Sequence, residues 1–179
     1  MTFSNPSLEA QRLPLLEEAL LEPVSRRLAP CQAVLRTLHW LFLALVACFL
    51  PLLREEFAVW LPWLLVGVAT LGGSSVLMGW CDARRRAYGL RLHDLIYRRG
   101  LLVRRTQVLP LVRLQHVETL SNPIERAFGL VRLACFTAGG RGADMVLEGL
   151  TAERAAAIRQ HLLAQLEGTP ETHSGPDVP

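Results

Sequence analysis

The sequence contains no lysine, and all 19 of its basic residues are arginine. Arginine binds phosphate in a bidentate manner better than lysine does, so this composition raises the question of an anion site. An absence that extends over the whole chain is, however, typical of a GC-rich genome. The lack of lysine therefore gives no information on function by itself.

The sequence also lacks paired cysteines. Its four cysteines are separated by 17, 33 and 54 positions, no CxxC pair occurs, and no histidine lies at zinc-ligand spacing from any of them. Cys48 and Cys81 fall in or beside apolar runs, which is typical of small buried side chains rather than of a disulfide framework. We therefore expect no metal and no cofactor.

Catalytic motifs are missing as well, since the chain has no Walker A, GxGxxG, GxSxG or HExxH pattern. The glycine-rich residues 138–143 join two predicted strands and precede no helix, so they indicate a hairpin loop. His93 and Asp94 suit a turn, and His116 and Glu118 suit a pair on one strand face. We predict no catalytic residues, no enzyme activity and no small-molecule substrate.

Two long segments contain almost no charge. Residues 34–53 have only Arg36 and His39 as ionisable side chains, both near the start, and residues 57–80 have none in 24 positions. About 20 helical residues cross the hydrocarbon layer of a bilayer. A buried helix of a soluble protein normally has a polar stripe, which 57–80 lacks. The pattern predicts a transmembrane helical hairpin over residues 34–81 with a short loop at 54–56.

The charges that flank the hairpin predict its orientation. The loop has one arginine and two glutamates, whereas both outer flanks are rich in arginine. These flanking arginines are Arg26, Arg27 and Arg36 before the hairpin, and Arg84, Arg85, Arg86 and Arg91 after it. By the positive-inside rule both ends of the chain are cytosolic. We therefore expect a multi-pass protein of the bacterial cytoplasmic membrane, an integral part of the lipid bilayer.

The two ends of the chain are predicted to lie outside any folded domain. Residues 1–33 are interpreted as a cytosolic leader, in which 15–22 suit either an amphipathic helix or a disordered segment. The tail, residues 168–179, is rich in Pro, Gly, Ser and Thr and is expected to be disordered.

From residue 82 to 167 the pattern changes to short alternating runs that indicate strands. The predicted strands cover 87–92, 95–99, 101–109, 112–120, 130–137 and 144–150, where 101–109 is either one strand or two. Pro123 begins a short helix that Gly129 closes, and Thr151 caps a helix that runs to about Leu166. The fold class is thus a two-helix transmembrane hairpin followed by an all-β domain of about seven strands capped by a C-terminal α-helix.

A set of motifs in this domain resembles a known family over residues 83–166. They include Leu95-Ile96-x-Arg98-Arg99-Gly100, Arg113-Leu114-Gln115-His116-Val117-Glu118 and Pro123-x-x-Arg126-x-Phe128-Gly129-Leu130. In this order they resemble the bacterial pleckstrin-homology-like (PH-like), or membrane-flanked domain, family. The preceding hairpin is similar to the YdbS-like two-span branch.

The resemblance implies two roughly orthogonal antiparallel sheets, a capping helix, no reaction, membrane association and a link to envelope stress. Longer relatives repeat the domain between membrane spans, whereas this chain has a single copy. The resemblance therefore implies a membrane protein partner, such as a longer multi-copy PH-like relative, or self-assembly. This gives the first functional hypothesis, a non-catalytic interaction module at the cytosolic face of the membrane.

A second hypothesis is binding of anionic lipid headgroups by arginines near the membrane. The candidate contacts are Arg84, Arg85, Arg86, Arg98, Arg99, Arg104 and Arg105. The alternative interpretation is that 84–86 only flank the span and that the others form the solvated face of a sheet. Nucleic acid is not expected as a partner, because the domain has few aromatic residues for stacking bases.

Overall fold

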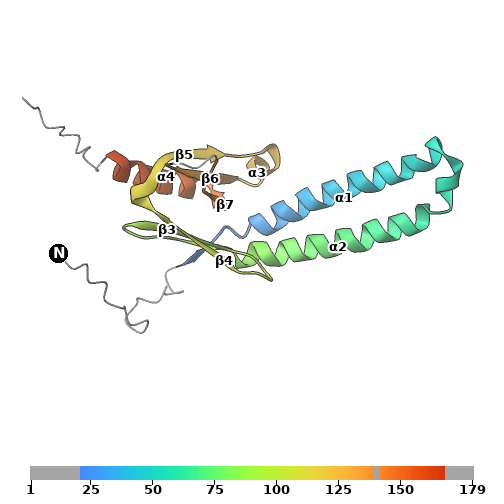
Figure 1. The fold of residues 1–179 in the computed structure, drawn as a ribbon, viewed down its shortest axis with the longest axis horizontal. Helices are drawn as coiled ribbons and strands as arrows, with labels where there is room; N and C mark the ends of the chain where they lie inside the picture. Colours follow the sequence, from blue (N-terminus) through green and yellow to red (C-terminus); the bar gives the residue numbers. More distant parts are fainter. Residues whose placement is uncertain (1–20, 139–141, 168–179) are drawn as a thin grey trace, which may run out of the picture.

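The computed structural model describes residues 21–138 and 142–167, and a long helical hairpin extends from one end of a small β domain (Figure 1). The hairpin consists of α1 (Leu28–Leu53) and α2 (Leu61–Arg85). Arg54 and the 3-10 helix η3 (Glu55–Ala58) connect the two helices at the far end. The predicted leader up to residue 20 and the predicted tail lie outside the described residues.

Helix α1 begins at Leu28, six residues before the predicted start at residue 34. Leu28, Ala29 and Cys31 are buried in the core of the β domain. The predicted start lies too far along the chain, because the uninterrupted apolar run marks only the exposed part of the helix. Pro30 does not interrupt it, since a proline in the first helical turn replaces an N–H that has no intrahelical acceptor.

Helix α2 is shifted in the opposite direction relative to the predicted 57–80. It begins at Leu61, with Pro62 in its first turn, and continues to Arg85. Proline favours the start of a helix because its φ angle is already helical. The last turn persists past Trp80 because Ala83 is buried in the domain core and Asp82 binds residues of the domain.

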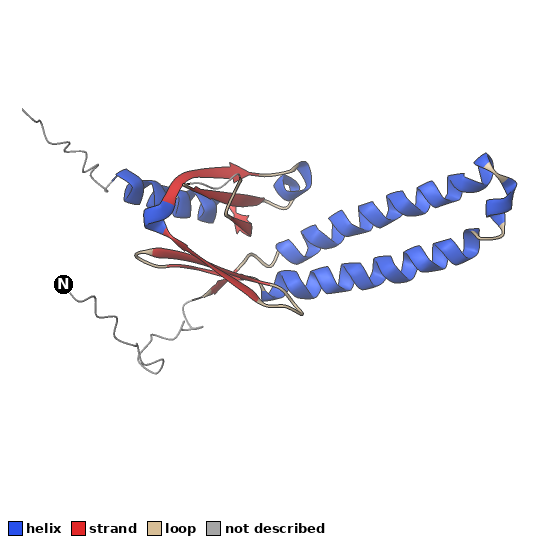
Figure 2. Ribbon diagram, viewed as in Figure 1, coloured by secondary structure: helices blue, strands red, loops and turns tan. Residues whose placement is uncertain are grey.

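The β domain has seven strands in two antiparallel sheets, as predicted (Figure 2). One sheet has the order β1-β2-β3-β4 and the other the order β5-β6-β7. The strands of the first sheet are β1 (Glu22–Pro23), β2 (Ala87–Leu90), β3 (Asp94–Arg99) and β4 (Arg105–Pro110). Those of the second are β5 (Leu114–Leu120), β6 (Leu130–Thr137) and β7 (Met145–Thr151).

Several strand limits differ from the predicted ones. The turn between β2 and β3 uses residues 91–93 rather than His93 and Asp94, and residues 101–104 form a loop rather than a strand. A short 3-10 helix, η4 (Leu111–Arg113), separates β4 from β5. In β5 the register shifts between Leu114 and His116, so that Leu114 and Val117 are both buried. This bulge explains the imperfect alternation of the sequence there.

The two helices of the β domain form as the sequence predicts. In α3 (Pro123–Ala127) the Asn122 side chain accepts a hydrogen bond from the Glu125 N–H at 2.7 Å, and the Glu125 carboxylate accepts one from the Asn122 N–H at 3.0 Å. The Thr151 hydroxyl accepts from the Arg154 N–H at 3.3 Å at the start of α4 (Ala152–Glu167). The buried face of α4 packs on the second sheet, which completes the core.

The segment just before α1 is part of the β domain, which corrects its assignment to a leader. Strand β1 pairs with β2, and the Ser25 N–H donates to the Gly149 carbonyl of β7 at 2.9 Å. Gly149 has a φ of 81°, and a Cβ there would lie 2.7 Å from Leu28. Residues 22–31 therefore connect the two sheets, and both ends of the hairpin are fixed in the domain. The composition of this segment gave no sign of that role.

Candidate functional site

The surface of the hairpin is the first candidate interaction surface. Both helices are long and apolar enough to cross a membrane. In each helix only 6% of an apolar 18-residue stretch is buried within the chain. Large side chains such as Leu41, Phe42, Leu52 and Trp63 are 60–77% exposed. A core helix of a soluble protein would be mostly covered by its own fold. Outside their domain end, only Ala47, Gly72 and Gly79 of these two helices are buried.

An apolar groove of about 770 Å³ lies between the two helices. Its lining includes Trp40, Ala69, Gly73 and Trp80. A Cβ on Gly73 would meet no atom within 4 Å, so the small pair Ala69 and Gly73 faces open space. Small residues on an open helix surface allow another helix to approach closely in a membrane.

Five of the seven candidate arginines gather around one polar pocket of about 350 Å³. Arg84 and Arg85 belong to the last turn of α2, Arg86 follows them, Arg98 comes from β3, and Arg104 comes from the loop between β3 and β4. Several guanidinium groups around one pocket suit a multiply charged anion such as a phosphate. Of the seven arginines that the sequence suggested as contacts, five thus lie around this one pocket.

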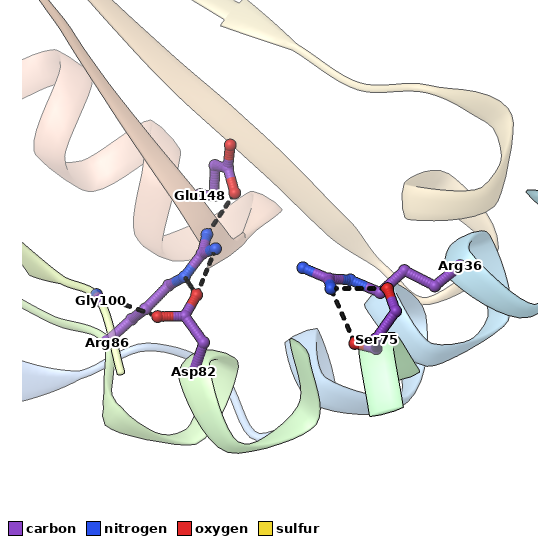
Figure 3. Close-up of polar contacts among 6 residues, drawn as sticks. All are labelled: Arg36, Ser75, Asp82, Arg86, Gly100 and Glu148. Atoms are coloured by element: carbon purple, nitrogen blue, oxygen red, sulfur yellow. Dashed lines mark hydrogen bonds and ion pairs between the residues drawn. The ribbon is translucent and has the colours of Figure 1, made fainter. Parts of the chain in front are cut away.

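Arg86 is a structural residue rather than a free contact (Figure 3). It is only 9% exposed, its guanidinium donates to Asp82 Oδ2 at 2.7 and 2.9 Å, and it forms an ion pair with Glu148 of β7. Burial alone would lower the pKa of Arg86, but nearby Tyr97, Asp82 and Glu148 outweigh it and raise that pKa. Arg86 therefore stays charged and bound within the domain.

Arg99 and Arg105 lie beside the pocket and face each other as cross-strand partners of β3 and β4. Like charges opposite each other destabilise a strand pair, so this pair favours an anionic neighbour. Arg105 is exposed and Arg99 is half-buried. Neither is among the described residues that line the pocket. The candidate surface thus consists of a pocket with an adjoining pair of arginines.

Asp82 holds the loop between β3 and β4 in place, a role that the sequence interpretation missed. Its Oδ1 accepts a hydrogen bond from the Gly100 N–H at 2.9 Å while its Oδ2 binds Arg86 (Figure 3). One carboxylate in the last turn of α2 therefore binds both Gly100 and Arg86, which line the arginine pocket. The spacing of Asp82 and Arg86, four positions apart at the end of α2, was the available signal.

A second polar cluster, also missed, connects β1, β2 and α4. Arg154 forms an ion pair with Glu22 and donates through Nε to the Tyr88 hydroxyl at 3.0 Å, and that hydroxyl donates to Glu22 at 3.0 Å. Hydrogen bonds from Arg154 and Tyr88 lower the pKa of Glu22. The three residues are far apart in sequence, so only the fold brings them together.

Reactive groups elsewhere in the described residues are few. Among residues 21–138 and 142–167 no group of three or more His, Cys, Asp or Glu side chains could hold a metal ion. His116 and Glu118 contact each other at 3.2 Å on an exposed strand face. Cys135 is fully buried, and burial raises the pKa of its thiol to about 11, so it is a poor nucleophile.

Two small antiparallel sheets with a capping helix, preceded by two long apolar helices, are the arrangement expected of the PH-like family. The family model described as Bacterial PH domain matches residues 33–166. The chain therefore belongs to the bacterial PH domain family, as its motifs predicted. A PH-like domain supports a role in interaction. Neither the curated proteins nor the solved structures contain a match. The YdbS-like branch stays a prediction.

Proposed function

We propose that the protein is a non-catalytic interaction module anchored in the bacterial cytoplasmic membrane. The hairpin spans the bilayer, and the PH-like domain lies at the cytosolic face, where it binds a membrane protein partner or a second copy of the chain. The observation that supports anchoring best is the exposure of the two apolar helices, whose spans are only 6% buried. In water such a surface would be costly, because exposed apolar area is unfavourable.

The topology is supported by the arginines at the domain end of the hairpin. Arg84 and Arg85 follow the second span, and the connecting turn at the other end has two glutamates. Labelling of intact cells with a membrane-impermeant maleimide tests this, using Glu55→Cys and Arg159→Cys in a chain without the accessible native cysteines. We expect labelling of E55C from outside and of R159C only after permeabilisation. Labelling of R159C in intact cells would contradict the orientation.

The interaction role is supported by the open groove beside Ala69 and Gly73, which offers a surface for another transmembrane helix. Purification of the tagged full-length chain from mild detergent, with crosslinking before solubilisation, tests it. We expect a membrane protein, such as a longer multi-copy relative, or a second copy of the chain to copurify. Substitution of Gly73 by leucine should reduce recovery, whereas Gly67→Leu should not, because Gly67 is not among the residues that line the groove. The link to envelope stress is part of this proposal and rests on the family resemblance.

A second candidate function is recognition of anionic lipid headgroups by the arginine pocket. It is favoured by Arg84, Arg85 and Arg104 at the edge of one polar pocket beside the end of α2. Native mass spectrometry of the full chain can count retained phosphatidylglycerol molecules. We expect the triple substitution of these arginines by glutamine to lose bound phosphatidylglycerol, and a control with Arg113→Gln and Arg159→Gln to keep it. Equal retention in both would exclude the pocket.

A further inference from the structure

The short loop between β3 and β4 exposes two adjacent apolar side chains. Its residues 100–104 read GLLVR, and Leu102 and Val103 are 80% and 69% exposed. Most of the other strongly exposed large apolar side chains belong to the hairpin helices. Two adjacent apolar residues at the tip of a loop are costly in water and favourable in a membrane interface.

The register of the first sheet places this loop beside the end of α2. Strand β2 begins at Ala87, just after α2, and Ala87 pairs with Arg98 of β3. Because the two strands are antiparallel, residues after Arg98 run back past the start of β2 along the last turn of α2. Figure 1 shows the loop under the domain end of α2. The tip therefore points toward the region that the hairpin occupies, and not away from it.

Two contacts hold the loop in that position. The Gly100 N–H donates to Asp82 of α2 at 2.9 Å. Gly100 has a φ of 106°, and a Cβ on it would lie 2.0 Å from the Val103 carbonyl oxygen, so the turn is tight and depends on glycine. The loop is thus a stiff extension fixed to the end of a predicted membrane span.

The residues around the loop are those expected at the level of lipid headgroups. The Arg84 guanidinium lies 5.1 Å from the centre of the Trp80 ring, and tryptophan and arginine at a span end are typical of the membrane interface. Asp82, which binds the loop, lies between these two residues in sequence. Arg99, Arg104 and Arg105 flank the apolar tip on both sides.

We propose that the tip of the β3–β4 loop, Leu102 and Val103, inserts into the cytosolic leaflet beside α2. The flanking arginines then lie at the depth of the lipid phosphates. Together with α1 and α2 the loop gives the domain a third attachment, which sets the orientation of its sheets relative to the membrane. The proposal rests on the proposed membrane anchoring of the hairpin and adds to it a membrane contact of the β domain itself.

Spin labelling of the full chain in nanodiscs of phosphatidylethanolamine and phosphatidylglycerol tests the insertion. Cys48 and Cys81 are replaced by serine, the buried Cys31 and Cys135 stay, and single labels are placed at Leu102, Leu92 or Leu71. Collision with oxygen reports lipid, and collision with a water-soluble nickel chelate reports solvent. Leu92 is the matched control, since it is 66% exposed in the β2–β3 turn at the other end of the sheet.

Leu71, 60% exposed on α2, reports the anchoring separately. Insertion predicts that the labels at Leu102 and Leu71 collide mainly with oxygen and that the label at Leu92 collides mainly with nickel. If Leu71 is in lipid and Leu102 behaves like Leu92, insertion is wrong and the anchoring stands. If Leu71 is in water, the anchoring is wrong and insertion fails with it.

A second variant distinguishes the affinity of the loop for the leaflet from the affinity of the spin label for the leaflet. With the label at Val103, Leu102→Asp should move the label from lipid to solvent, because an aspartate at that depth is unfavourable. The substitution Leu92→Asp should leave the Val103 label in lipid. No change with Leu102→Asp would show that the label alone draws the loop into the leaflet and would overturn the proposal.

Discussion

Arg86 forms an ion pair with Glu148, and this contact joins the end of α2 to the second sheet of the domain. The two residues are 62 positions apart in the chain. Because Arg86 also binds Asp82 in the last turn of α2, the helix end and both sheets form one packed unit. A movement of the hairpin relative to the domain would have to break these bonds.

Replacement of Arg86 by alanine should destabilise the full chain by about 3 kcal/mol, because it leaves Asp82 and Glu148 partly buried without their cation. Thermal unfolding in detergent, followed by tryptophan fluorescence and circular dichroism, measures the change. The matched control is Arg85→Ala, an exposed neighbour, which should change the free energy of unfolding by less than about 0.5 kcal/mol. Equal effects of the two substitutions would show that the ion pair has no structural role.

Gly149→Ala should destabilise the junction between β7 and the start of α1. Gly149 has a φ of 81°, and an added Cβ would lie 2.7 Å from the Leu28 side chain. The left-handed backbone alone costs a non-glycine residue about 1–3 kcal/mol, and the contact with Leu28 adds to it. Gly142→Ala is the control, since nothing lies within 4 Å of its Cβ position. A Gly149→Ala protein as stable as Gly142→Ala would contradict the observed packing of α1 on β7.

Much of this fold could be predicted because local patterns agree with it. The apolar runs predicted two helices, alternation predicted the strands, the family resemblance implied two sheets, and Pro123 and Thr151 marked the starts of the two domain helices, as the structure confirms. The start of α1 and both limits of α2 could not be predicted from hydropathy. Residues such as Leu28 and Ala83 extend the helices for the sake of the domain core, and hydropathy does not separate contact with lipid from contact with protein.

The sequence predicted which arginines are candidates for the site but not how they are arranged. The sequence indicated seven arginines near a span, and the fold gathers five of them around one pocket. The sequence could not show that Arg86 is buried, because that burial depends on Glu148 in a distant strand. Nor could it place Leu102 and Val103 in a loop rather than in a strand. Their position follows from the β2–β3 register and from the bond of Gly100 to Asp82.

The stability of the chain should decline in acid partly through Glu22. Its pKa is lowered from 4.5 by hydrogen bonds from Arg154 and Tyr88. A lowered carboxylate pKa gives stability that is fully present above pH 4.5 and is lost as the pH falls through the lower folded value. Glu22→Gln should therefore flatten the dependence of unfolding temperature on pH below about 4.5.

At neutral pH the same substitution should cost less than about 1 kcal/mol, because the ion pair is half-exposed and screened by solvent. Unfolding curves between pH 3 and pH 7, with Glu153→Gln as the control on α4, measure both effects. An unchanged acid slope in the Glu22 variant would exclude this cluster as a source of acid sensitivity.

Gly79 should prove essential for the packing of the two hairpin helices. Arg36 of α1 donates through Nη1 to the Ser75 carbonyl at 2.8 Å and to the Ser75 hydroxyl at 3.2 Å (Figure 3). The Arg36 side chain also lies against Gly79 of α2. A Cβ on Gly79 would lie 2.4 Å from Arg36 Nε. Gly79→Leu should therefore displace the guanidinium from Ser75 and leave a charge without its acceptors near the membrane.

We expect Gly79→Leu to lower the unfolding temperature of the hairpin by several degrees, which corresponds to about 1–3 kcal/mol for a disrupted packing contact. Gly67→Leu is the matched control, because the position of its Cβ is open and Gly67 does not line the groove. Trp40 and Trp80 line the groove between the helices, so their fluorescence reports this region directly. If Gly79→Leu and Gly67→Leu unfold at the same temperature, the contact between Arg36 and α2 does not hold the hairpin together.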